Sequence, residues 1–535
     1  MTTSTAPAVA YAQLWTADPG SWRAAGAAWA GATGLVDRRV GELADRAAAL
    51  GGGWSGAAAT AADGRLTGLR AELTAIAPAL IEADQVLAEH AGRLAAAKGR
   101  LAAAVAVADA SGLSIDRDGR VWADPARGRP SERDGPATAR VVAALRDALE
   151  LAGAADRVAA FRLDALSAAA GTGWATPPPP GRPARDATPA QVRAWWAGLT
   201  PPEQRWLVAH EQALVGRLDG VPVAARDQAN RLLLGARRAE LLAERRRLLT
   251  RVPPGPIESA RLHWVDGRLA GLDALAERLT GPGGPRAYLL GLDTAGEGRV
   301  VVALGDPDHA DRVVTYVPGM TAGLDDAPGE LTRAGRVLDR CAVLAPGERS
   351  AAVLWLDYDA PDFLHEAVSA GQARDAAPGL HRFQEGLRAT HEGPPARQTV
   401  LGHSYGSLVV GTAAREHGLA ADALVFVGSP GVGAAHADEL RVPPGQVWAS
   451  TAPDDVIRLT RPPDELALRA LRGLSPLAAV LTGPGRGEPE LRFGADPAGP
   501  AFGGRVFDSG RHGHTGYWEP DNPALDGMAR IVLGR

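Results

Sequence analysis

The sequence of 535 residues contains a single cysteine, Cys341, and a single lysine, Lys98. One cysteine cannot form an internal disulfide, and it cannot build a zinc site from cysteine ligands. A Walker A loop and the nucleotide-binding strand of a protein kinase each need a lysine in a defined setting. Lys98 lies in the stretch Ala96–Gly99, which has neither setting. ATP chemistry of these two kinds is therefore not expected.

Long apolar runs are also missing. None approaches the ~20 residues of a membrane-spanning helix, so no transmembrane segment is expected. Residues 1–7 have neither the basic nor the apolar region of a conventional signal peptide. Two locations follow as alternatives, the cytoplasm or export without such a signal. The net charge of -5 gives no reason to expect binding to nucleic acid.

The histidines are scattered and form no H-E-x-x-H pattern, so we expect no metal site. A hydrophobic content of 46% and a charged content of 22% are those of a globular protein. A chain of 535 residues is too long for one core, which predicts two to four domains.

The hydrophobic pattern divides the chain into four parts. Residues 1–171 are predicted to form a helical hairpin or bundle, because leucines recur there with heptad spacing. Residues 172–187 are proline-rich and predict a linker. Residues 188–280 predict helices that pack on the next domain. In residues 281–535 strand-like runs alternate with helical stretches, which predicts an α/β domain with a mostly parallel sheet and an antiparallel edge.

About eight strands are expected in the last part. In chain order they are Tyr288–Leu292, Val300–Leu304, Val313–Val317, Ala352–Leu356, Thr399–Leu401, Ala423–Val427, Val447–Ser450 and Arg505–Phe507. Candidate functional residues are sought where these strands end, because binding sites of open α/β sheets lie at the carboxyl ends of the strands.

The most informative motif is the pentapeptide Gly402–Gly406, G-H-S-Y-G, which follows the fifth expected strand and precedes a helix-forming stretch. In that context G-x-S-x-G predicts a nucleophile elbow with Ser404 as the nucleophile. Both glycines suit the tight turn, where a Cβ would clash with neighbouring backbone. The alternative is an ordinary turn serine, since a chain with 65 glycines can contain the pattern by chance.

A serine nucleophile needs a histidine to accept its proton and a carboxylate to orient that histidine. Asp454 and Asp455 follow the seventh strand, and we favour Asp455 as the acid and Asp454 as a helix cap. His512 and His514 follow the eighth strand, and we favour His514 as the base. The order Ser, Asp, His is that of α/β-hydrolases. Residues 515–518 are expected to form a mobile loop that enters the last helix.

An oxyanion hole needs two backbone N–H donors. The first is expected from Tyr405, which begins the helix after the elbow. The second is expected from Met320, in the loop after the third strand, where Gly319 lets the backbone turn toward the site. His403 stands at a strand end beside the nucleophile and is expected to pack or to orient a neighbour.

Several motifs agree in their order with one family. They are Leu218–Pro222, Arg226–Arg231, Gly402–Ser407, Val427–Gly433, Asp455–Ile457 and Gly513–Tyr517. Together they resemble the actinobacterial α/β-hydrolases once grouped as domain of unknown function 1023, over roughly residues 188–535. The resemblance implies an α/β-hydrolase fold with a Ser–Asp–His triad, and it says little about the substrate.

The tripeptide Trp54–Gly56 has the form W-x-G and lies between two expected helices. Residues 1–171 are therefore similar to the WXG100 hairpins of type VII secretion, which implies a type VII secretion partner or another helical-hairpin partner. The associated Y-x-x-x-D/E pattern is missing, because no tyrosine occurs between Tyr11 and Tyr288. A glycine and a tryptophan also suit any hairpin turn, and the hairpin can equally dimerise, dock on a partner or cover the active site.

Two functions are therefore weighed. The first is a serine hydrolase of the esterase or lipase kind, which acts on an ester or lipid through an acyl-enzyme and needs no cofactor. In this hypothesis residues 461–504, between the acid and the histidine, form a lid or an acyl pocket. The second is an effector or binding protein associated with type VII secretion, whose N-terminal helices mediate export or partner binding, with weak or no hydrolase activity.

Overall fold

The structure of the protein is a computed structural model. It describes residues 9–51, 53–123, 134–172, 179, 181–250, 255–281, 284–320, 322–361, 369–459 and 491–535. Two compact units divide the chain. The first comprises residues 1–178, 201–209 and 282–285, and the second comprises residues 179–200, 210–281 and 286–535. Each unit is described by itself.

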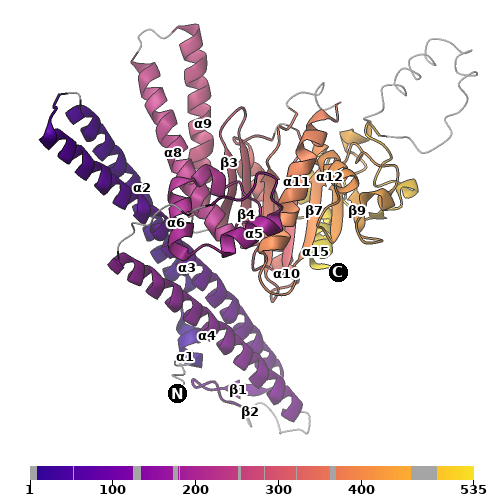
Figure 1. Cartoon of the computed structure of the whole chain (residues 1–535). Helices are drawn as coiled ribbons and strands as arrows, with labels where there is room; N and C mark the ends of the chain where they lie inside the picture. Colours follow the sequence, from indigo (N-terminus) through magenta and orange to yellow (C-terminus); the bar gives the residue numbers. More distant parts are fainter. Residues whose placement is uncertain are drawn as a thin grey trace, which may run out of the picture. The chain divides into compact units, whose positions relative to one another are not determined.

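The first unit is mainly helical (Figure 1). Its elements are α1 (Tyr11–Thr16), α2 (Pro19–Gly51), α3 (Ala57–Ala110), β1 (Leu113–Ile115), β2 (Val121–Ala123), α4 (Asp134–Thr172) and most of α6 (Pro201–His210). The helices α2 and α3 form a hairpin, with Trp54–Gly56 between them and Trp54 46% exposed. The N-terminal helical region predicted from the sequence is thus present.

A small core holds α1, α3 and α4 together. Large apolar side chains alternate in it with alanines, which let the helices approach closely. Its largest members are Leu14, Leu94, Leu101, Leu113, Val141 and Leu145. The two short strands β1 and β2 pair in an antiparallel way and turn at Gly119, whose positive φ of 81° suits glycine.

The second unit contains a sheet with helices on both faces (Figure 1). Its helices are α5 (Pro189–Ala197), α7 (Gln212–Val215), α8 (Val223–Leu249), α9 (Pro256–Thr280), α10 (Ala327–Leu344), α11 (Gly371–Thr390), α12 (Tyr405–Glu416) and α15 (Pro523–Leu533). Short 3-10 turns are η2 (Ala437–Leu440), η3 (Val456–Leu459), η4 (Pro500–Phe502) and η5 (Gly516–Trp518). Among the described helices of the whole chain, none combines the length and the apolar composition that crossing a membrane requires.

The sheet has eight strands in the order β10-β9-β8-β7-β5-β6-β4-β3. They are β3 (Ala287–Asp293), β4 (Arg299–Leu304), β5 (Arg312–Val317), β6 (Ser350–Leu356), β7 (Arg397–His403), β8 (Ala423–Val427), β9 (Val447–Ser450) and β10 (Arg505–Val506). From β10 to β6 all neighbours pair in parallel, whereas β4 pairs antiparallel with both β6 and β3. The eight predicted strands and the antiparallel edge are thereby confirmed.

Burial explains why the central strands β6 and β8 are almost continuously apolar. In β8 every residue is buried, and in β6 and β7 only the first residue of each strand is not. The helices α11 and α12 pack together, as do α10 and α15, and both α12 and α15 contact β5 and β7. These two helix pairs cover opposite faces of the sheet, so the strands between them have no face open to solvent.

The edge strand β3 is covered by polar side chains of α8. Asp227 accepts a hydrogen bond from the Leu289 N–H at 2.8 Å, and Asn230 donates one to the Leu289 carbonyl at 3.0 Å. Arg231 also donates to the Ala287 carbonyl at 2.9 Å. An unpaired sheet edge invites pairing with another chain, and these side chains occupy part of the edge instead.

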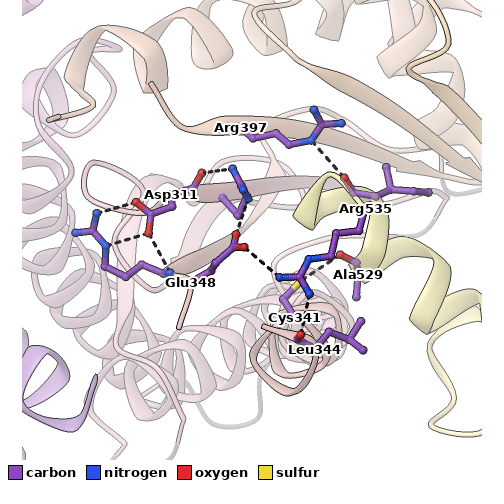
Figure 2. A network of polar contacts seen from close by, with 10 residues as sticks. Asp311, Cys341, Leu344, Glu348, Arg397, Ala529 and Arg535 are labelled. Carbon is purple, nitrogen blue, oxygen red and sulfur yellow. Dashed lines mark hydrogen bonds and ion pairs between the residues drawn. The ribbon is translucent and has the colours of Figure 1, made fainter. Parts of the chain in front are cut away.

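A second polar network lies where β5, β6 and β7 begin (Figure 2). Asp311 and Arg349 form a two-pronged ion pair at 2.8 and 3.2 Å, and Glu348 contacts Arg535 at 3.3 Å. Arg535 also donates to the Leu344 carbonyl at 3.0 Å, at the end of α10. These contacts hold the end of α15 near the amino ends of the strands. The candidate site is expected at the opposite, carboxyl ends.

Candidate active site

Ser404 lies in a strained turn between β7 and α12. Its φ of 52° and ψ of -127° make it one of two non-glycine residues with positive φ among the described residues. Such a conformation costs about 1–3 kcal/mol and persists only when the surroundings enforce it. A Cβ on Gly402 would lie 2.7 Å from the Ser407 Cα, and one on Gly406 would lie 2.2 Å from the Val317 carbonyl oxygen. The turn therefore requires glycine at both positions.

Three side chains from separate strand ends form one line of hydrogen bonds. The Oγ of Ser404 lies 3.0 Å from the Nε2 of His514. The Nδ1 of His514 lies 2.8 Å and 3.0 Å from the two carboxylate oxygens of Asp455. Ser404 follows β7, Asp455 follows β9, and His514 follows β10. The structure thus brings together the three residues favoured from the sequence.

The Asp455 carboxylate is buried, with 3% of the residue exposed. Burial by itself raises the pKa of a carboxyl group. Hydrogen bonds from His514, from the Tyr517 hydroxyl at 2.6 Å and from the Ile457 N–H at 2.8 Å outweigh that effect and lower the pKa of Asp455. The carboxylate is therefore ionised near neutral pH, and it fixes the Nδ1–H tautomer of His514.

Asp454 is exposed, and the contact with His514 belongs to Asp455. The capping role expected of Asp454 also belongs to Asp455, whose Oδ1 accepts the hydrogen bond from the Ile457 N–H in η3. One carboxylate can do both because its two oxygens offer about four acceptor positions.

The loop after β5 lies against the nucleophile. A Cβ on Gly319 would be 2.7 Å from the Cβ of Ser404 and 3.2 Å from its Oγ. The Tyr358 hydroxyl donates to the Pro318 carbonyl at 2.7 Å and thereby holds the loop in place. Met320, half-buried, follows Gly319 in this loop. The loop backbone therefore stands at contact distance from Ser404.

The other expected donor, Tyr405, is the first residue of α12. The first N–H groups of a helix have no carbonyl partner within it, and the helix dipole adds partial positive charge at this end. The phenol of Tyr405 has a separate, structural role. Its hydroxyl donates to the Ser369 carbonyl at 2.7 Å and accepts a hydrogen bond from the Ala373 N–H at 3.3 Å. These bonds fix the elbow against the start of α11.

Known proteins resemble this chain in sequence. Residues 293–465 match a family model described as alpha/beta hydrolase. An uncharacterized protein of Mycobacterium tuberculosis is 31% identical over 391 residues, which cover 67% of this chain and 56% of that protein. An uncharacterized protein of Mycobacterium bovis is 34% identical over 228 residues, which cover 40% of this chain and 84% of that protein. The chain belongs to the alpha/beta hydrolase family.

This alpha/beta hydrolase spans only about half the length of the first of these relatives. Among solved structures, it is similar to a dienelactone hydrolase from Anabaena variabilis, with 14% identity, a TM-score of 0.27, and coverage of 47% of this chain and 97% of that one. It is also similar to an esterase from Pyrobaculum calidifontis, with 14% identity, a TM-score of 0.26, and coverage of 56% and 96%. Among the described residues, no group of three or more His, Cys, Asp or Glu side chains is placed to hold a metal ion.

Three residues of this alpha/beta hydrolase were not singled out by sequence reasoning. Tyr517 donates to the buried Asp455 carboxylate, and Tyr358 fixes the loop beside Ser404. A Cβ on Gly428, which has a φ of 56°, would lie 2.9 Å from the Asp455 Oδ2 and 3.2 Å from the His514 Nδ1. The only signal for Tyr517 and Gly428 was their place in the family motifs. Tyr358, two residues after the end of β6, carried none.

The prediction of a mobile loop at residues 515–518 is wrong. Tyr517 is 0% exposed and Trp518 is 1% exposed, and both belong to η5. The Tyr517 hydroxyl is tied to Asp455 on one side and accepts the Ala452 N–H at 3.0 Å on the other. The sequence around these residues suggested a loop because the residues that hold the two rings in place lie far away in the chain.

The segment expected as a lid or acyl pocket, residues 461–504, falls partly outside the described residues, which resume at Leu491. Phe493 exchanges backbone hydrogen bonds with the loop after β8, from its N–H to the Pro430 carbonyl at 3.0 Å and from the Gly433 N–H to its carbonyl at 2.8 Å. Its ring meets Tyr405 edge-on, with centroids 6.1 Å apart. The described end of this segment therefore packs beside the turn that carries Ser404.

Proposed function

We propose that this protein is a serine hydrolase that cleaves ester bonds through an acyl-enzyme. The observation that carries the proposal is the line of hydrogen bonds from Ser404 through His514 to Asp455, built on a strained elbow. Ser404 is the nucleophile, His514 the general base and then the general acid, and Asp455 the group that orients His514.

In the first half of the reaction the Ser404 Oγ attacks the ester carbonyl carbon, and its proton moves to the Nε2 of His514. The carbonyl π electrons move to the oxygen, which becomes an oxyanion. The oxyanion accepts hydrogen bonds from the backbone N–H groups of Tyr405 and Met320. The tetrahedral intermediate then collapses, the bond to the alcohol oxygen breaks, and His514 protonates the departing alcohol.

In the second half, water attacks the acyl-enzyme while His514 accepts one of its protons. The new tetrahedral intermediate collapses, Ser404 regains a proton from His514, and the carboxylic acid leaves. The ionised Asp455 stabilises each imidazolium that forms. Each oxyanion donor typically contributes about 3–4 kcal/mol, so the loop at Met320 should matter to the rate, although less than the charge on Asp455.

The direct test is labelling with a fluorophosphonate probe, which reacts with activated serines. We expect the wild type to be labelled and Ser404→Ala not to be. Equal labelling of both proteins, or none of the wild type, would refute the proposal. With turnover established, a chain-length series of nitrophenyl esters separates a preference for short esters from one for lipid-like acyl chains.

Neighbouring aspartates offer a matched pair of variants for the acid. Asp455→Asn leaves the shape of the site but removes the charge and favours the wrong histidine tautomer, so we expect kcat to fall by about 10³–10⁴-fold. Asp454→Asn changes an exposed carboxylate and should alter kcat by less than about threefold. Similar losses in both variants would contradict the assignment of the acid.

A second candidate function rests on a different observation, the exposed Trp54 in a W-x-G turn between α2 and α3. An exposed tryptophan at a helical hairpin turn suits recognition by a type VII secretion partner or another helical hairpin. The test is Trp54→Ala in the full chain, with export and esterase turnover measured in parallel. Loss of export with unchanged turnover supports this role, and unchanged export contradicts it.

A further inference from the structure

We infer that His403 is a positioning residue, which holds the segment bearing His514 in place through a hydrogen bond to the His514 carbonyl. The inference rests on the proposed function and adds a residue to its machinery. His403 is the last residue of β7 and precedes Ser404 directly. Two consecutive residues at one strand end therefore contact the same histidine, one at its backbone and one at its side chain.

The geometry of the His403 contact is specific. Its Nε2 lies 3.0 Å from the His514 carbonyl oxygen, and the residue is 4% exposed. A carbonyl oxygen only accepts hydrogen bonds, so the Nε2 carries the proton and donates. Burial and the neighbouring His514 lower the pKa of His403 to about 3. Arg333 and Asp455 are the other charged groups that act on it. His403 is thus a neutral donor throughout the working pH range of a serine hydrolase.

Packing reinforces this contact. The His403 ring contacts two rings of the same segment, with centroids 4.9 Å from that of His514 and 5.0 Å from that of Trp518. The Arg333 guanidinium covers Trp518 at 5.2 Å, and Arg336 donates to the Trp518 carbonyl at 3.1 Å. The segment is therefore tied at two carbonyls, that of His514 by β7 and that of Trp518 by α10.

The consequence for catalysis follows from distance. The Oγ of Ser404 and the Nε2 of His514 are 3.0 Å apart, which is proton-transfer range. A misplacement of about 1 Å at a reacting group can lower the rate by about 10²-fold. Without the bond from His403, the backbone of His514 loses its link to the strand that presents Ser404. The proton transfer should slow, while substrate binding should remain unchanged.

Two substitutions separate the hydrogen bond from the packing. His403→Phe keeps a ring and loses the donor, whereas His403→Gln loses the ring and keeps an N–H donor. We expect His403→Phe to lower kcat for a nitrophenyl ester by about 10–100-fold at unchanged KM. His403→Gln should be at least about fivefold faster than His403→Phe, because it restores the donor.

A matched control is His381→Phe. His381 also contacts a backbone carbonyl, that of Gly418 at 2.8 Å, but it lies on α11 outside the site. Its substitution should leave kcat unchanged. Amide hydrogen exchange over residues 512–518 gives a readout that does not depend on turnover. We expect faster exchange there in His403→Phe and exchange close to wild type in His403→Gln.

Several results would overturn the inference. One is a kcat within twofold of wild type in His403→Phe together with unchanged exchange over residues 512–518. Another is an equal loss in both His403 variants with faster exchange throughout the sheet, which would indicate a packing role only. If the wild type fails to react with fluorophosphonate, the proposed function fails separately. The exchange difference between the two His403 variants then decides the inference by itself.

Discussion

Tyr517→Phe is the substitution whose effect the structure defines most closely. The Tyr517 hydroxyl donates to the Asp455 carboxylate at 2.6 Å and accepts the Ala452 N–H at 3.0 Å. Phenylalanine keeps the buried ring, so no cavity forms. The change removes one donor from a buried charge and leaves one backbone N–H without its partner.

The magnitude follows from these two bonds. A hydrogen bond to a charged group contributes about 1.5–3 kcal/mol, and a buried donor left without a partner costs about 1–3 kcal/mol. We therefore expect Tyr517→Phe to lower the free energy of unfolding by about 3–5 kcal/mol. For the second unit, at about 2.1 cal/mol/K of unfolding entropy per residue, that corresponds to a Tm lower by roughly 4–7 °C.

The loss should depend on pH because Asp455 titrates. Its pKa is lowered in the folded protein, so its stabilising effect is present above the ordinary carboxyl pKa of about 3.9 and is lost as the pH falls through the folded value. Removing the Tyr517 hydroxyl raises the pKa of Asp455. The stability difference between wild type and variant should thus be largest near pH 7 and shrink below about pH 4, with the part due to Ala452 remaining.

Calorimetry from about pH 2 to pH 8 measures this difference across the titration of Asp455, and Tyr358→Phe is the matched control. The Tyr358 hydroxyl donates to a neutral acceptor, the Pro318 carbonyl, so its loss should cost about 1 kcal/mol at every pH. A stability difference for Tyr517→Phe that stays constant over this range, or that grows toward acid pH, would refute the reasoning from the charge of Asp455.

Two further predictions concern Gly319, beside Ser404, and the buried Cys341. Gly319→Ala places a methyl group 2.7 Å from the Ser404 Cβ, so fluorophosphonate labelling should slow at least about tenfold. Gly329→Ala, with open space around the new methyl group, should label at the wild-type rate, and equal rates for both variants would contradict the contact. Cys341 is buried and burial raises the pKa of its thiol to about 12, so iodoacetamide should not modify it at pH 8 unless the protein is unfolded. Rapid modification of the folded protein, read by mass spectrometry, would contradict that burial.

Local patterns in the sequence were sufficient for the elements of the fold. The eight strands were found because each is an apolar run bounded by turn residues, a property of a few consecutive residues. The elbow was found for the same reason, since Gly402 and Gly406 report a local steric demand around Ser404. The antiparallel edge followed from the short connection between the first two strands, which leaves no room for a crossover helix.

Contacts between distant strands were not readable in the same way. Tyr517 was interpreted as part of a mobile loop, because its partners Asp455 and Ala452 lie about sixty residues earlier in the chain. Tyr358 has no local motif, and its role exists only because β6 ends beside the loop that contains Gly319. Such roles depend on which strands are neighbours in the sheet, and that order is not sequential.

The sequence by itself thus determined the α/β class, the strands, and the order of the serine, the aspartates and the histidines. Each of these depends on residue types and spacings within short stretches of the chain. Only the tertiary structure decided which histidine meets Ser404 and which aspartate meets that histidine. His514 contacts Ser404 and Asp455 contacts His514, whereas their neighbours His512 and Asp454 do not make these contacts. The physical reason is that side chains one or two positions apart in the chain point in different directions. Which of them reaches a partner depends on how the strands are assembled in the sheet.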